Sequence, residues 1–72
     1  MNVLYTSPVF NTKVLVPEAA VKTYQRRDAA LLKLKALGGI YAPNTPEVRK
    51  LRNTMLAARR KIEREHWFCQ SI

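Results

Sequence analysis

Apolar side chains follow two patterns along the chain, an extended one at the start and a helical one afterwards. Residues 2–16, NVLYTSPVFNTKVLV, are rich in β-branched and aromatic side chains and contain a Ser-Pro and an Asn-Thr turn signal. This composition predicts extended chain broken by a turn. We expect a hairpin that pairs about 3–6 with 13–16, and the alternative is one strand that pairs with a second chain. A lone two-stranded ribbon is only marginally stable, so this segment must pack on other elements.

The first helix is predicted over residues 17–37. Pro17 suits the first helical position, where a missing N–H costs nothing, and Glu18 complements the helix dipole. Strong helix formers follow until Gly38 and Gly39, and glycine just past the last turn is the expected stop.

A loop over residues 38–45 leads to a second helix at 46–67. Its start carries an N-cap hydroxyl, a proline and an acid in Thr45, Pro46 and Glu47. Neither Gly nor Pro interrupts the following residues. Two long helices joined by a short loop predict an antiparallel helical hairpin.

The buried faces of the two helices differ in width. In the second helix one narrow apolar stripe has the 3, 4, 3, 4 spacing of heptad a and d positions, and its members are Val48, Leu51, Met55, Ala58 and Ile62. The first helix carries apolar residues on a broader arc, which includes Tyr24 and Leu32, and this arc exceeds what one partner helix covers. We therefore expect a mainly α, single-domain chain (residues 1–72) that forms a dimer through Tyr24 and Leu32. The alternative is a monomer wrapped by its own N-terminal ribbon.

Length and cysteine content limit how the fold is stabilised. A chain of 72 residues buries only about 60 % of its unfolded surface and is marginal without help. The one cysteine, Cys69, allows no intrachain disulfide, which fits a reducing compartment. No apolar run approaches a membrane span and no signal-peptide pattern is present, so we expect a cytoplasmic protein. Oligomerisation remains as the expected source of stability.

Charge adds the first functional indication. The net charge is +8, and residues 49–61, RKLRNTMLAARRK, hold six bases and no acid. Surface helices usually mix acids with bases in i,i+4 pairs, so this imbalance costs repulsion and indicates a polyanionic partner. By helical spacing all these bases lie away from the apolar stripe. The candidate nucleic-acid-binding residues are Arg49, Lys50, Arg52, Arg59, Arg60, Lys61 and Arg64.

The first helix carries a second basic line, formed by Lys22, Arg26 and Lys33. Antiparallel packing would join the two lines into one surface or leave them on opposed sides, and spacing does not decide between these arrangements. Arg27 lies near the apolar face, where its stem packs and its charged head reaches water.

Leu56 and Trp67 are apolar residues that fall among these bases. Trp67 is expected to stack on a base, to lie under Arg64, or to fold back with Phe68 after the helix frays, and a packing or interface role is favoured. As anchors within a charged rim, Leu56 and Trp67 would instead indicate a protein-interaction module, an inhibitor or adaptor that docks on an acidic surface.

Enzymatic chemistry has little support in the sequence. His66 and Cys69 are three residues apart, but no orienting third group or oxyanion loop accompanies them. The acids show no catalytic pairing, and no nucleotide-binding or metalloprotease motif is present. We expect no enzyme, no cofactor and no metal.

One resemblance bears on the same region. The stretch VRKLRNTMLAARRKIER resembles the basic second helix of a ribosomal-protein helical hairpin, that of the L29 family, over about a quarter of the chain. The N-terminal segment and the long loop depart from that pattern, so no residue role is carried over. The size and basicity are also typical of small phage or mobile-element accessory proteins.

Overall fold

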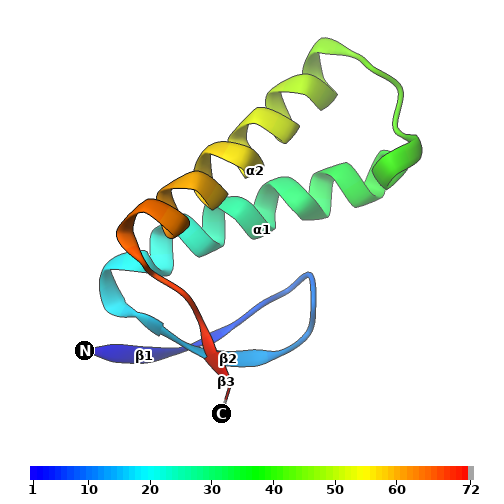
Figure 1. Cartoon of the computed structure of the whole chain (residues 1–72). Helices are drawn as coiled ribbons and strands as arrows, with labels where there is room; N and C mark the ends of the chain where they lie inside the picture. Colours follow the sequence, from blue (N-terminus) through cyan, green and yellow to red (C-terminus); the bar gives the residue numbers. More distant parts are fainter. Residues whose placement is uncertain (72) are drawn as a thin grey trace.

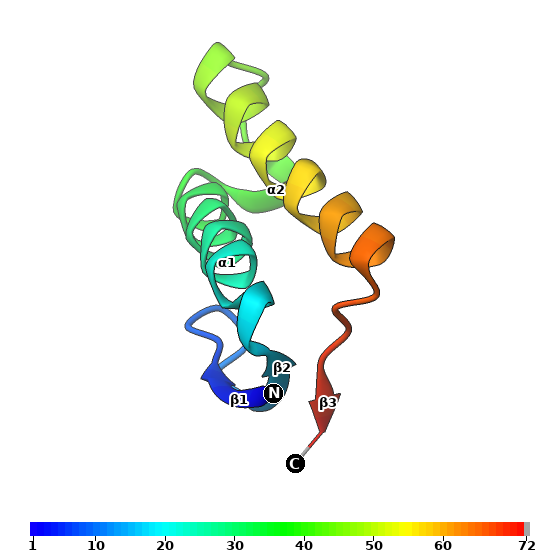
Figure 2. The same cartoon turned by 90° about the vertical axis from the view of Figure 1, so that its left-hand side faces the viewer.

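The computed structural model describes residues 1–71, in which two antiparallel helices pack with a three-stranded sheet (Figure 1). The strand order is β1-β2-β3 and both pairings are antiparallel. Figure 2 shows the sheet below α1, with the segment after α2 descending to add the last strand. The elements are β1 (Asn2–Thr6), β2 (Lys13–Pro17), the 3-10 turn η1 (Glu18–Ala20), α1 (Val21–Ala36), the 3-10 turn η2 (Gly39–Tyr41), α2 (Pro46–Glu65) and β3 (Gln70–Ser71).

The predicted N-terminal hairpin and helical hairpin are both present. Val3 pairs with Val16, and Thr6 with Lys13, so β1 pairs within the chain. The predicted cap is also present, because the Thr45 hydroxyl oxygen accepts a hydrogen bond from the backbone N–H of Val48 at 3.2 Å. The α2 stripe faces inward.

Three local features differ from the prediction. Pro17 is the last residue of β2 and not the first of a helix. The N–H of Glu18 still donates a hydrogen bond to the carbonyl of Met1 on β1's side at 2.9 Å, and the α-helix begins only at Val21. At its other end α2 stops at Glu65, since His66 adopts a left-handed conformation (φ 55°). The chain then turns back, and β3, which the sequence does not predict, pairs with β2.

The core consists of two clusters at opposite ends of the helix pair. One joins the sheet to both helices and contains Tyr5, Val16, Ala20, Tyr24 and Ile62. The other lies near the helix-connecting loop and contains Leu34, Ala42 and Val48. Tyr24 is only 2 % exposed, because the chain's own hairpin covers that side of α1, so in this structure Tyr24 offers no surface to a second chain. Leu32 is 40 % exposed, and the dimer stays a prediction.

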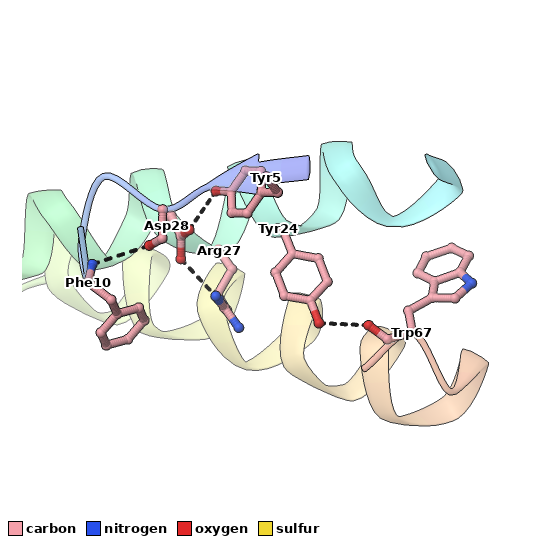
Figure 3. A network of polar contacts seen from close by, with 7 residues as sticks. Tyr5, Phe10, Tyr24, Arg27, Asp28 and Trp67 are labelled. Carbon is pink, nitrogen blue, oxygen red and sulfur yellow. Dashed lines mark hydrogen bonds and ion pairs between the residues drawn. The ribbon is translucent and has the colours of Figure 1, made fainter. Parts of the chain in front are cut away.

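A buried carboxylate fastens the hairpin to α1. Asp28 is fully buried, and its two oxygens accept hydrogen bonds from the Tyr5 hydroxyl at 2.5 Å and from Nε of Arg27 at 3.0 Å (Figure 3). A buried charge is tolerated only when it is paired and hydrogen-bonded, and both conditions are met here. The position of β1 over α1 is therefore set by a polar contact as well as by apolar packing.

Arg27 extends this network toward the hairpin loop. Its guanidinium lies 4.7 Å from the ring centre of Tyr24 and 6.0 Å from that of Phe10. The loop itself is ordered by Ser7, whose hydroxyl and carbonyl oxygens accept hydrogen bonds from the N–H groups of Phe10 (3.2 Å) and Asn11 (2.9 Å). Arg27, expected to keep its head in water, is instead half-buried and links the loop to the core.

Tyr5→Phe tests the polar contact with Asp28. Removing the hydroxyl leaves one buried carboxylate oxygen without a donor, so we expect a loss of about 1.5–3 kcal/mol in the free energy of unfolding. Urea denaturation followed by circular dichroism measures it. Tyr41→Phe is the matched control because Tyr41 is 87 % exposed, and it should change stability by less than about 0.5 kcal/mol. Equal stability of the two variants would contradict a structural role for the contact.

Stability should also fall in alkali. Burial, and then the Asp28 carboxylate, raise the pKa of Tyr5 well above its usual value, and burial also raises the pKa of Tyr24. Above about pH 10 the unfolded chain therefore loses tyrosine protons that the folded chain retains, and the free energy of unfolding falls as pH rises. Each of the two tyrosines contributes up to about 1.4 kcal/mol per pH unit. Urea titrations from about pH 8 to 11 should give a shallower decline for Tyr5→Phe than for the wild-type chain, and an equal decline would contradict the role assigned to Tyr5.

Candidate nucleic-acid interface

Antiparallel packing brings Arg26 and Lys33 of the α1 basic line to the same face as bases of α2, whereas Lys22 does not line that face. Two adjoining hollows run along the seam between the helices and share Arg26 and Thr54, so they form one continuous depression. We call it the basic trough. Between its bases the trough is lined mostly by small side chains, which we call its floor: Thr23, Ala29, Ala30, Leu51, Thr54, Ala57 and Ala58. Its bases are Arg26 and Lys33 from α1 and Lys50, Arg60, Lys61 and Arg64 from α2.

The seven candidate residues of α2 are divided by the fold. Lys50, Arg60, Lys61 and Arg64 line the trough, and Arg49 borders a neighbouring hollow on the outer side of α2 that also includes Lys50. The remaining two lie on the other flank of the helix. Arg52 lines a separate apolar hollow, and Nε of Arg59 pairs with Oε1 of Glu63 at 3.2 Å. Helical spacing predicts these bases as outward-facing and puts Lys50 and Lys61 on one shoulder of the helix and Arg52 and Arg59 on the other, and the fold divides these four residues in the same way.

Little negative charge offsets the trough. Within residues 1–71 the ion pairs are Arg27–Asp28, Arg59–Glu63 and Arg64–Glu65, of which only Arg64 belongs to the trough. Its Nε lies 3.8 Å from the Glu65 carboxylate, and both side chains are exposed, so this pair is weak. Glu47 is the acid that lines the depression, beside Lys33 and Lys50. The lining of the trough thus holds six bases and one acid, an excess of positive charge that would attract a polyanion.

Trp67 lies apart from the trough, folded back onto the core. It packs against the cluster that contains Val16 and Tyr24, and its carbonyl oxygen accepts a hydrogen bond from the Tyr24 hydroxyl at 2.6 Å (Figure 3). Lys61 lies 5.7 Å above the indole ring. Of the predicted roles, the folded-back one is present, whereas Phe68 stays 56 % exposed. The partner-anchor role would require an exposed Trp67, and the side chain is half-buried.

The other candidate features carry no site. Cys69 is exposed and free, and within residues 1–71 no three His, Cys, Asp or Glu side chains gather in a way that could hold a metal ion. Neither α1 nor α2, the two long helices of the described chain, has the length and apolarity to cross a membrane.

Comparisons with protein-family models, with curated proteins and with solved structures found no match to this chain. The functional conclusion therefore depends on the geometry and charge of the chain itself.

Trp67→Ala should destabilise the fold. The half-buried indole packs on the sheet-side core, so its removal should cost about 2 kcal/mol in the free energy of unfolding, measured by urea denaturation. Phe68→Ala, at the neighbouring exposed position, should cost less than about 0.5 kcal/mol. A Trp67→Ala variant as stable as Phe68→Ala would show that the indole contributes nothing to the core.

Proposed function

We propose that this chain is a non-enzymatic module that binds nucleic acid through phosphate contacts in the basic trough. The observation that carries the proposal is the convergence of bases from two helices on one depression. Arg26 and Lys33 come from α1, and they face the bases of α2 across a floor of alanines. A solvated helix face needs charge, but it does not need an excess of one sign on both sides of a seam.

The small floor suits a phosphate backbone. Alanine side chains leave the depression open, so a backbone can approach while the longer Lys and Arg side chains reach it from both rims. Arginine and lysine on phosphate oxygens fix position without reading bases. No aromatic side chain lines the trough, so stacking on single-stranded bases is not available there. Binding should therefore depend weakly on sequence and follow backbone charge density, which favours a duplex.

A double charge reversal tests the trough. Arg26→Glu/Arg60→Glu changes one exposed base on each helix, and we expect affinity for a duplex of about 20 base pairs to fall at least about tenfold. The slope of log K against log salt should become shallower by about 1.5–2, as two phosphate contacts are lost. Fluorescence anisotropy between about 50 and 200 mM salt measures both quantities.

The control keeps the same change in net charge. Lys13→Glu/Lys35→Glu alters two exposed bases outside the trough, and circular dichroism checks that all variants fold. If this control weakens binding as much as the trough variant does, overall charge accounts for the affinity and the trough is not the site. Failure of the wild-type chain to bind any duplex would refute the proposed function itself.

A further inference from the structure

A second hollow, which we call the apolar groove, shares no lining residue with the basic trough. Its volume is about 570 Å³, and it lies between the β1–β2 loop, α1, η2 and α2. Arg52 lines it and Lys50 lines the trough, and two positions along a helix turn a side chain by about 200°. The two depressions therefore occupy opposite flanks of the helix pair. The apolar lining includes Phe10, Leu31, Ile40, Met55 and Leu56.

Several large apolar side chains that line this groove are exposed. Phe10 is 60 % exposed, Ile40 85 % and Leu56 38 %. Clusters of such residues on one surface, rimmed by polar groups, mark interaction sites more often than scattered single residues do. The sequence places Leu56 among bases, but it does not indicate that Phe10 and Ile40, far away in the chain, lie beside it.

The exposed wall is built in advance of any partner. Ser7 is buried, and its side-chain oxygen accepts a hydrogen bond from the N–H of Phe10. The guanidinium of Arg27 faces the Phe10 ring. These contacts hold the loop in place without burying the ring. Pre-organisation of this kind lowers the entropy that binding must overcome.

The charges around the groove select the kind of partner. Its charged lining residues are Lys35 and Arg52, and no acid lines it. A second copy of this chain would carry another net charge of +8 to the contact, so self-association is opposed by repulsion. A partner that presents apolar side chains flanked by carboxylates meets both the lining and the rim.

We propose that the apolar groove binds an acidic amphipathic helix of a partner protein. An amphipathic helix lays apolar residues at i, i+3, i+4 and i+7 into such a groove. Its acids would then face Lys35 and Arg52, with Leu56, Phe10 and Ile40 as the apolar contacts. This interaction uses a surface separate from the trough and does not depend on the proposed nucleic-acid binding.

The test uses the full chain and synthetic helical peptides of about 16 residues. One peptide carries Leu at the four anchor positions and Glu elsewhere, and a second keeps the leucines and replaces every Glu with Lys. We expect the acidic peptide to bind at least about tenfold more tightly, with amide chemical-shift changes centred on Phe10, Ile40 and Leu56. Leu56→Glu should weaken it at least about tenfold, whereas Leu4→Glu, a control on a side chain that is 56 % exposed in β1, should not.

Several outcomes would overturn the proposal. The proposal is wrong if the acidic peptide does not bind at about millimolar concentration, at which even a weak contact is detected. Equal binding of the Lys peptide, or chemical-shift changes confined to the basic trough, would show that the groove is not the selective site. Sedimentation that reveals a dimer disrupted by Leu56→Glu would assign the groove to a second copy of the chain. Duplex binding by Leu56→Glu at wild-type affinity would establish that the two surfaces are separate.

Discussion

The buried carboxylate of Asp28 is the constraint on which the arrangement of this small fold depends. A charge without solvent contact must be paired and hydrogen-bonded, and here two hydrogen-bond donors lie against the carboxylate. Tyr5 reaches Asp28 from the hairpin, and Arg27 comes from the adjacent position on α1. Satisfying one carboxylate therefore fixes the hairpin over α1. It also turns the Arg27 guanidinium between the rings of Tyr24 and Phe10, which places the wall of the apolar groove.

The position of the hairpin then determines how α2 and its tail are placed. Because β1 and β2 cover one side of α1, α2 packs on another side, and its Ile62 joins the sheet-side core. The Tyr24 hydroxyl holds the carbonyl of Trp67, so the chain leaves the helix and runs back to pair as β3. The chain thus covers one side of α1 with segments from both of its ends. The two flanks of the helix pair remain open, one basic over alanines and the other apolar.

Local signals predict the parts of the fold that are set locally. The Thr45 cap and the inward stripe of α2 follow from capping chemistry and periodicity, and the strand composition predicts the hairpin, although its turn residues leave the register open. The features that are not predicted depend on contacts distant in the chain. Glycine usually marks a helix end, but α2 ends at a histidine. His66 takes a left-handed conformation next to Trp67, which packs on the core. One signal in the sequence could have indicated that Asp28 is buried. It lies four residues after Tyr24, on the same face of the helix.

Charge is the part of the sequence that the fold explains least. Three of the thirteen Lys and Arg residues form ion pairs within residues 1–71, and two of those pairs are exposed. The remaining bases repel one another on a chain of marginal size, although a helical hairpin packs equally well with acids among them. Both proposed ligands are anionic and would relieve this repulsion from opposite flanks. The helix pair between the flanks is about 10 Å thick, which is only about one screening length at 0.1 M salt, so an anionic ligand on one flank would still lower the positive potential at the other. The two proposed ligands would therefore draw on the same positive charge, and each would weaken the binding of the other less as the salt concentration rises.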